Sequence, residues 1–365
     1  MALKCGIVGL PNVGKSTLFN CLSSAKAQSA NFPFCTIEPN VGTINVPDVR
    51  LEKLEELVEP ERVVPNTMEI VDIAGLVKGA SEGEGLGNQF LGNIRETDAI
   101  LHVIRCFDDG NIIHVDGSID PIRDKETIDM ELQLKDLETV EKRIEKAKKV
   151  ARSGDKDAKK AVEFFETVIS TLEEGKSIRS MVLSEDQNVL VKELNLITAK
   201  KVLYVCNIDE ASLEGGNAYV DKIKEVAAAE NAGVIMISAQ LEADIAELED
   251  YEERKMFLED AGLKEPGVNK LIRKAYELLN LSTYFTAGVK EVRAWTIMKG
   301  MTAPQAAGVI HSDFEKKFIR AEVIKYEDFV EFGSELGAKE AGKLSAEGKD
   351  YVVENGDIMH FLTGA

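Results

Sequence analysis

Short apolar runs and segments of helical spacing alternate through residues 1–127. Three apolar runs have the length and composition of buried strands: Leu3–Val8, Thr67–Val71 and Ala99–Cys106. Three segments carry apolar residues at helical spacing: Ser16–Ala25, Val49–Glu59 and Gly87–Thr97. This alternation predicts an α/β fold, in which helices cover a mainly parallel sheet and ligands bind beyond the carboxyl ends of the strands.

Residues 128–199 differ from this pattern, because they are highly charged, poor in proline and helical in spacing. Two apolar stripes run along them: Met130, Leu134, Leu137, Ile144 and Ala147, then Ala161, Phe165, Val168 and Leu172. A turn-like break at 152–155 separates the stripes, so we expect two long antiparallel helices that form an inserted α-helical hairpin of coiled-coil type. Strand-like sequence returns at Lys201–Cys206 and Val234–Ile237, which indicates that the sheet continues after the insertion.

A third pattern begins near Leu281. Short strand candidates are mixed with small helices there: Thr283–Thr286, Val289–Thr296, Ile319–Ile324, Tyr351–Val353 and Ile358–Leu362. They predict a separate compact α+β domain over 279–365. Residues 1–127 and 200–278 would then form the sheet domain, and 128–199 the helical insertion.

Composition and charge indicate the kind of environment and partners that the protein has. The chain has 365 residues, 44% hydrophobic and 30% charged, and its net charge of −20 predicts a surface that repels nucleic acid except where basic residues cluster. The scattered cysteines are expected to be buried free thiols: Cys5, Cys21, Cys35, Cys106 and Cys206. No apolar stretch approaches the length of a membrane span. We expect a cytoplasmic monomer without a membrane partner.

The segment Gly9–Ser16 carries the strongest functional signal. It reads Gly-Leu-Pro-Asn-Val-Gly-Lys-Ser and lies between a predicted strand and a predicted helix. In such a loop the glycines let backbone N–H groups turn toward phosphate, Lys15 adds a cation and Ser16 offers a hydroxyl to Mg²⁺. The helix that begins near Lys15 directs the positive end of its dipole at the same anion. The chain is therefore expected to bind a nucleoside triphosphate.

Further residues match what a phosphate-binding loop needs. Asp72 ends a predicted strand and begins Asp-Ile-Ala-Gly; its carboxylate is expected to orient Mg²⁺ through water, and the N–H of Gly75 to sense the γ-phosphate. Thr36, in a loop after the first helix, would give the metal a second hydroxyl, and a solvent-facing threonine is the alternative. Four glycines within 79–87 suit a switch segment.

The nucleotide base is expected at the end of a later strand, where Asn207-Ile208-Asp209-Glu210 stands. Guanine-specific proteins carry Asn-Lys-x-Asp at this place, and their aspartate accepts hydrogen bonds from guanine. Here Ile208 replaces the lysine and Glu210 the aspartate, which weakens the case for GTP without establishing ATP. Ser238, after the next predicted strand, matches the loop that contacts the far side of the base.

Together these motifs resemble the Obg-like ATPases, a family in the translation-factor class of P-loop NTPases. The resemblance rests on Gly9–Ser16, on the glycine-rich residues 72–91 and on Asn207 to Glu210, and it extends over the whole chain. It implies a P-loop nucleotide-binding domain, the helical insertion and a C-terminal TGS domain of β-grasp type. The family's Asn-x-x-Glu marker, here Asn207 and Glu210, implies a preference for ATP.

The resemblance also implies roles for single residues. Six residues would hold the phosphates: Asn12, Val13, Gly14, Lys15, Ser16 and Thr17. Ser16 and Thr36 would hold Mg²⁺, and Asn207 with Ile208 would face the base. Asn12 also matches an asparagine that related enzymes use to hold K⁺.

Hydrolysis also needs a group that orients the attacking water. Ras-like enzymes orient the attacking water with a glutamine directly after Asp-x-x-Gly, and Leu76 stands at that position here. Hydrolysis is therefore expected to be slow, or to be completed by another group. The family suggests His114, in the polar loop 107–114, as a catalytic residue beside Lys15; an incidental loop histidine is the alternative.

A cluster of basic residues suggests where a partner binds. Nine basic and three acidic residues lie between Lys142 and Lys160, a local charge of +6. At the tip of the hairpin they would contact RNA phosphates, and a ribosome or ribosomal subunit is the expected partner; a solvated helix end is the alternative. Two other functions stay open, namely an Obg-type GTPase and a nucleotide-gated RNA-binding protein with negligible hydrolysis.

Overall fold

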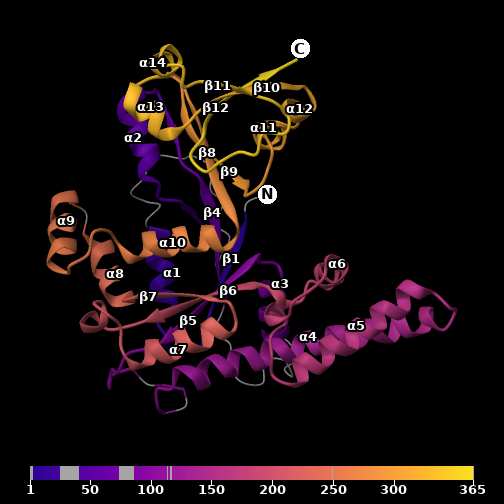
Figure 1. The fold of residues 1–365 in the computed structure, drawn as a ribbon. Coiled ribbons are helices and arrows are strands. Elements are labelled where there is room, and N and C mark those ends of the chain that lie inside the picture. The colour runs from indigo at the N-terminus through magenta and orange to yellow at the C-terminus, as the bar shows by residue number, and fades with distance from the viewer. Residues whose placement is uncertain are drawn as a thin grey trace. The chain divides into compact units, whose positions relative to one another are not determined.

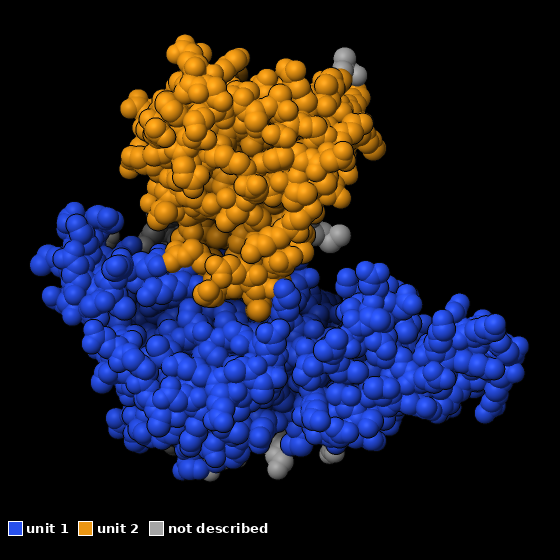
Figure 2. Space-filling model, viewed as in Figure 1, with its two compact units in different colours: residues 1–44, 69–271 blue, residues 45–68, 272–365 orange. Residues whose placement is uncertain are grey.

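The computed structural model describes residues 3–24, 41–73, 86–112, 114–115, 117–248 and 250–364 (Figure 1). The chain divides into two compact units (Figure 2): unit 1 comprises 1–44 and 69–271, and unit 2 comprises 45–68 and 272–365. This division differs from the predicted boundaries, because 45–68 groups with the C-terminal unit and the helical insertion groups with the sheet. None of the helices described is both long and apolar enough to cross a membrane.

Unit 1 is built on a sheet with the strand order β2-β4-β1-β5-β6-β7. Its strands are β1 Lys4–Val8, β2 Val41–Asn45, β4 Thr67–Asp72, β5 Ala99–Arg105, β6 Lys201–Asn207 and β7 Gly233–Ile237. From β4 to β7 every neighbouring pair is parallel. All of β5 and nearly all of β6 are buried, which explains their continuous apolar sequence. The predicted mainly parallel α/β sheet is confirmed.

Helices lie between these strands and after the last of them. They are α1 Lys15–Ser24, α3 Leu86–Arg95, α7 Ala218–Ala229, α8 Ala239–Glu247, α9 Tyr251–Asp260 and α10 Gly267–Leu278, with a 3-10 turn η3 at Glu210–Ser212. The acidic stretch after β7 forms two helices because Asp250 caps a new one, accepting from the N–H groups of Glu252 and Glu253. Glu242 of α8 caps α10 in a similar way, since it accepts from the N–H groups of Gly267 and Val268 at 2.6 and 3.2 Å.

The predicted hairpin consists of α4 Pro121–Ala151 and α5 Lys156–Glu173, followed by η1 Ile178–Ser180, α6 Glu185–Leu194 and η2 Ile197–Ala199. Its buried face joins Val140 and Ile144 to Phe165 and Val168. Part of the predicted first stripe is wrong. Met130 and Leu134 are 43% and 42% exposed, while Ile128 and Leu132 are buried. The first half of α4 contacts β5 and α7 and the second half contacts α5, so the two halves bury different faces.

A buried ionic cluster, here called the anchor network, ties α4 to the sheet. It contains Lys125, Asp129, Arg179 and Glu230, with Tyr204 of β6 as a neutral partner. Lys125 Nζ lies 2.6 Å from Asp129 Oδ2 and also contacts Glu230. Arg179 Nη2 lies 3.2 Å from Asp129 Oδ1 and 3.3 Å from Glu230 Oε2, and the Tyr204 hydroxyl donates to Glu230. Burial alone would raise the pKa of Asp129, but the cations Arg179 and Lys125 lower it.

Unit 2 contains a second, mixed sheet with the order β11-β10-β12-β8-β9-β3. Its strands are β3 Val63–Val64, β8 Leu281–Ala287, β9 Val292–Met298, β10 Phe318–Ile324, β11 Ser345–Glu347 and β12 Ile358–Thr363. Its helices are α2 Val49–Val58, α11 Ala303–Ile310, α12 Ser312–Lys316, α13 Tyr326–Phe332 and α14 Glu335–Glu340. β12 runs parallel to β8 and β3 parallel to β9, and the other registered pairs are antiparallel. The predicted α+β character of the C-terminal region is confirmed.

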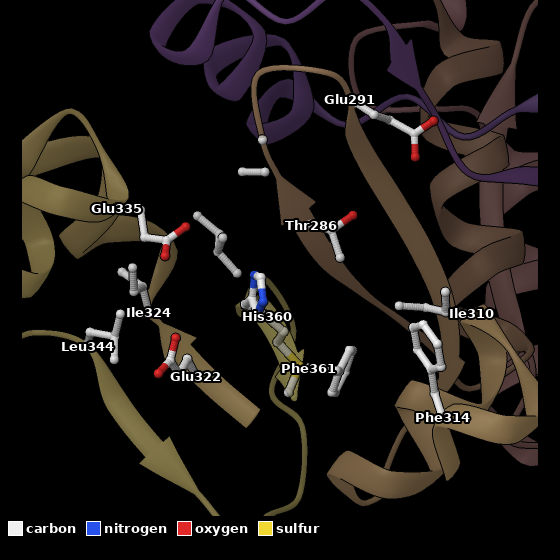
Figure 3. Close-up of a pocket in the computed structure, with 14 residues that line it drawn as sticks. Thr286, Glu291, Ile310, Phe314, Glu322, Ile324, Glu335, Leu344, His360 and Phe361 are labelled. Atoms are coloured by element: carbon white, nitrogen blue, oxygen red, sulfur yellow. The ribbon is translucent and has the colours of Figure 1, made fainter. Parts of the chain in front are cut away.

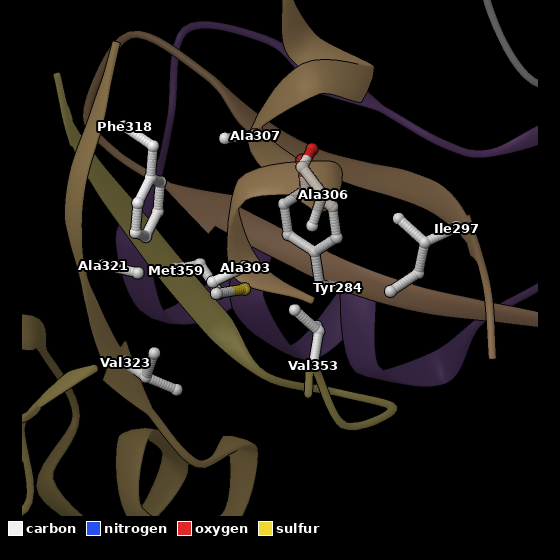
Figure 4. Close-up of a cluster of buried hydrophobic side chains, with 10 residues drawn as sticks. All are labelled: Tyr284, Ile297, Ala303, Ala306, Ala307, Phe318, Ala321, Val323, Val353 and Met359. Carbon is white, nitrogen blue, oxygen red and sulfur yellow. The ribbon is translucent and has the colours of Figure 1, made fainter. Parts of the chain in front are cut away.

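Two apolar clusters lie on opposite faces of this sheet. One packs Tyr284, Phe318 and Met359 against α11 (Figure 4). The other packs Leu51 and Leu54 of α2 against strand residues, which is why residues 45–68 belong to unit 2. Two strand predictions need correction. β9 begins at Val292 because a turn occupies 288–291, and Tyr351–Val353 forms only an isolated bridge from Val352 to Thr302.

Candidate functional site

The predicted site residues follow the carboxyl ends of adjacent parallel strands in unit 1. Ile7 of β1 is in register with Asp72 of β4, and Arg105 of β5 with Asn207 of β6. The loop after β1, the end of β4, the loop after β5 and the residues after β6 therefore meet at one edge of the sheet. This is the edge at which parallel α/β sheets bind ligands.

The phosphate-loop lysine lies buried at this edge. Lys15 begins α1, is 8% exposed, and makes an ion pair with Asp72. Its neighbour Ser16 is exposed on the first turn of the helix, so its hydroxyl is open to a ligand. The sequence expectation that Lys15 and Asp72 serve one site agrees with their contact. Two oxygen groups, the Ser16 hydroxyl and the Asp72 carboxylate, suit Mg²⁺, which prefers such ligands.

Asn207 holds the backbone of the phosphate loop through its side-chain amide. Its Nδ2 donates to the carbonyl oxygen of Val13 at 2.9 Å, and its Oδ1 accepts from the N–H of Ala239 at 2.9 Å. Gly14 has a φ of 91°, and a Cβ atom there would lie 2.3 Å from Asn207 Nδ2. Only glycine fits between the loop and this amide. One of the two N–H donors of Asn207 thus serves the loop.

The residues predicted to face the base differ in exposure. Glu210 is exposed at the start of η3. The side chain of Ile208 is buried and its backbone N–H donates to Ile237, so its contact with a base stays a prediction. Ser238 is buried and caps α8, where its hydroxyl accepts from the N–H of Leu241 at 3.4 Å.

A buried arginine organises the loop after β5. Arg105 is 1% exposed, and its guanidinium donates to the carbonyl oxygens of Phe107, Asp109 and Ile112 at 3.0–3.2 Å. It also lies over the Phe107 ring, 4.7 Å from the centroid. The loop that leads to His114 is therefore shaped from within by one side chain.

His114 is held against the first turn of α4. Its ring is buried, and Nε2 lies 2.7 Å from Asp124 Oδ2. Arg123 donates to the other oxygen of Asp124 at 2.9 Å. The polar loop that carries His114 thus folds so that its ring is buried against the Asp124 carboxylate. Its part in catalysis stays a prediction.

Several predicted ligand residues lie outside this description. Thr36 and Gly75 are not among the described residues, and neither is Cys35. The other four cysteines are buried free thiols, as predicted. Asn12 is exposed with a positive φ of 63°. Within the described ranges, no group of three or more His, Cys, Asp or Glu side chains is arranged to hold a metal.

Two residues of this edge, Arg105 and Asp124, were not anticipated from the sequence. Arg105 stands at the end of an otherwise apolar strand, and a charged residue in such a run signals buried hydrogen-bond partners. Asp124 carries no comparable signal, because acidic residues are common in the first turn of a helix.

Family models and solved structures agree on what this chain resembles. A model described as 50S ribosome-binding GTPase matches residues 4–152, and a model for the C-terminal domain of YchF GTPases, a domain of unknown function, matches 281–363. The structure of the Schizosaccharomyces pombe YchF GTPase has a TM-score of 0.88 at 41% identity, over 99% of this chain and 97% of that one.

Curated relatives match over the full length. The ribosome-binding ATPase YchF of Haemophilus ducreyi is 58% identical over 361 residues, and those of Escherichia coli O157:H7 and Bacillus subtilis are each 57% identical. Each alignment covers 99% of both chains. With its parallel sheet, its phosphate loop and its C-terminal domain in the same order, the chain belongs to the YchF family.

Proposed function

We propose that this chain is a slow, Mg²⁺-dependent P-loop ATPase that cleaves ATP to ADP and phosphate and associates with the ribosome in the cytoplasm as a monomer. The observation that carries the proposal is the buried Lys15 at the start of α1, paired with Asp72 at the carboxyl edge of the sheet. A triphosphate would replace Asp72 as the partner of the lysine, and the carboxylate would become available to the metal. The names of the relatives support ATP hydrolysis and ribosome binding.

In this proposal the chain's own groups bind and orient the nucleotide. Backbone N–H groups of 12–17 and the Lys15 ammonium would hold the phosphates, with Ser16, Thr36 and Asp72 as metal-holding groups. Bound Mg²⁺ supplies charge neutralisation at the phosphates. Asn12 is the residue that would hold K⁺.

The site is tested by Lys15→Ala, with Lys192→Ala on α6 as an exposed control. We expect the Lys15 variant to lose ATP hydrolysis by at least about a hundredfold while the control keeps its rate. Hydrolysis unchanged in the Lys15 variant would exclude this site. Activity that is equal in K⁺ and Na⁺ would remove the potassium proposal.

The base is tested by competition of ATP and GTP for the purified protein. We expect ATP to bind more tightly, because Glu210 replaces the aspartate that reads guanine. The S. pombe relative of known structure is named a GTPase, so GTP is the specific rival. Tighter binding of GTP by tenfold or more would favour it.

We further propose that His114 takes part in hydrolysis. Because its Nε2 faces Asp124, any step that uses this nitrogen requires the pair to separate. Single-turnover hydrolysis by His114→Ala should be slowed by tens of fold or more, as expected for loss of a group that orients or deprotonates water. A rate within twofold of the parent would exclude the histidine from the reaction.

The proposed ribosome contact is the basic tip, residues 142–160 at the end of α4 and the start of α5. Some of its cations already have partners, such as Lys148 with Glu166 at 3.3 Å. We expect the pair Lys149→Glu and Arg152→Glu to weaken co-sedimentation with ribosomes and to flatten its salt dependence. The exposed pair Lys222→Glu and Lys224→Glu on α7 is the charge-matched control. Equal loss in both pairs would assign the effect to net charge alone.

We also propose that residues 279–365 are a TGS domain of β-grasp type. The support is the sheet of unit 2, in which the parallel strands β8 and β12 are neighbours and α11 packs on one face.

A further inference from the structure

The sheet of unit 2 contains a gap between the end of β8 and the second half of β12, here called the slot, which has no role in the proposed ATPase. β8 and β12 are neighbours in the sheet, but Phe285 and Ile358 are the one registered pair between them. β8 ends two residues later, at Ala287, where the chain turns toward β9, whereas β12 continues to Thr363. A cavity of about 280 Å³ lies where the two strands part (Figure 3).

One edge of β12 faces this slot. The N–H of Phe285 donates to the carbonyl oxygen of Asp357 at 2.8 Å, so Asp357 points its backbone groups toward β8. Because backbone direction alternates along a strand, Phe361 and Thr363 point theirs the same way. The opposite edge is paired with β10 as far as Thr363. On the slot side, no described strand is registered with β12 beyond Ile358.

The lining of the slot combines apolar side chains with carboxylates. The apolar surface comes from both faces of the sheet and includes Ile310, Phe314, Ile324, Leu344 and Phe361. The charged lining residues are Glu291, Glu322 and Glu335. None of the described lysines or arginines lines the cavity, so it presents three negative charges.

Two of these glutamates have partners that a ligand can replace. Glu291 contacts Arg62, whose side chain is 64% exposed. Glu322 lies 3.4 Å from Arg320, whose side chain is 52% exposed. Because both arginines are largely exposed, these pairs are weaker than buried ones, and a cation that binds in the slot can compete with them.

We propose that the slot binds an extended segment of a partner protein, which adds as a strand to the open edge of β12 and directs lysine or arginine side chains at the three glutamates. Open strand edges bind extended peptides through backbone hydrogen bonds, and flanking pockets select the side chains. The charge complementarity favours a basic segment. The carboxylates repel phosphate, which disfavours RNA as the occupant. At about 3.3 Å per residue, β12 beyond Ile358 offers room for about five residues.

The test uses the full chain and a synthetic peptide of alternating valine and lysine, six residues long with blocked ends. Nuclear magnetic resonance follows the amide groups of Phe361 and Thr363. We expect both signals to shift and their hydrogen exchange to slow as peptide is added at millimolar concentration. Two N-methylated forms of this peptide test the backbone pairing: one carries N-methyl groups on its odd-numbered residues and the other on its even-numbered residues. One of the two forms should bind at least tenfold more weakly than the other, since only one of these two sets of N–H groups faces β12.

Charge reversal on α14 provides a matched pair of variants. Glu335 lines the slot and Glu340 ends the same helix away from it. Glu335→Lys should weaken peptide binding about fivefold, the size expected for an exposed charge pair, and Glu340→Lys should leave it unchanged.

Several results would overturn the proposal. These are unchanged Phe361 and Thr363 signals at millimolar peptide, equal binding of a matched peptide in which glutamate replaces every lysine, or equal effects of the two α14 variants. If exchange at these two amides slows with rising protein concentration and no peptide, the occupant would instead be a second copy of the chain. Stronger protection by a uridine oligonucleotide would identify RNA.

Discussion

The two side-chain hydrogen bonds of Asn207 offer the sharpest test of how the phosphate loop is held. In Asn207→Ala, the carbonyl of Val13 and the N–H of Ala239 each lose a hydrogen bond of 2.9 Å. Asn207 is 4% exposed, so water does not readily replace it. A buried group left without its partner costs about 1–3 kcal/mol. We therefore expect the Ala239 amide to exchange between about fivefold and a hundredfold faster.

Hydrogen exchange of the Ala239 amide measures this effect directly, and titration with a fluorescent ATP analogue reports the loop. Asn207→Asp separates the two bonds, because it keeps the acceptor for Ala239 but sets an oxygen against the carbonyl of Val13. It should retain Ala239 protection and lose nucleotide affinity, whereas Asn207→Ala should lose both. Asn188→Ala, which removes an exposed asparagine on α6, is the control. Unchanged exchange at Ala239 in Asn207→Ala would refute the reasoning.

Three further predictions follow from buried groups in unit 1. Gly14→Ala places a Cβ 2.3 Å from Asn207 Nδ2 and should abolish binding of the ATP analogue while the protein stays folded by circular dichroism. Burial lowers the pKa of His102 to about 4, so the folded protein resists protonation of this ring. The contribution of His102 to the free energy of unfolding is therefore complete above pH 6.5 and falls as the pH drops toward 4. At pH 5 the free energy of unfolding should be lower by about 2 kcal/mol, and thermal melts of His102→Gln should not show this decrease. Arg179→Met leaves the two carboxylates of the anchor network, Asp129 and Glu230, with Lys125 as their one shared cation, and this uncompensated buried charge should cost about 3–5 kcal/mol, whereas Arg143→Met, at an exposed pair, should cost less than about 1 kcal/mol in the same melts.

The gathering of Lys15, Asp72 and Asn207 at one edge of the sheet could be predicted because its sequence signals are local. Glycines, a lysine and a hydroxyl within Gly9–Ser16 must lie together whatever the rest of the chain does. The strand that precedes Asp72 and the strand that ends in Asn207 were both readable as apolar runs, and parallel pairing brings their carboxyl ends to one edge. The contact between Lys15 and Asp72 therefore agrees with expectation.

Other features depend on contacts that no local pattern reveals. The spacing of Leu51 and Leu54 predicts an amphipathic helix, but it does not say which of two sheets covers the apolar face. Met130 and Leu134 continue the helical stripe of the second half of α4, yet α4 changes partners along its length and leaves them exposed. His114 is held by Asp124, which lies on the next helix, so its burial could not be read from the polar loop that carries it.

The same helix links the candidate catalytic histidine to the basic tip. The first turn of α4 carries Asp124, which holds His114, and Lys125, which joins the anchor network. After Pro121 the helix contains neither glycine nor proline across its 31 residues, and so it lacks two residue types that commonly kink a helix over its length of about 46 Å. A shift of the first turn when His114 leaves Asp124 would therefore be carried along the helix axis to the tip rather than absorbed on the way. If His114 acts in hydrolysis and the basic tip binds the ribosome, as proposed, α4 would give the two events one physical path within unit 1 alone.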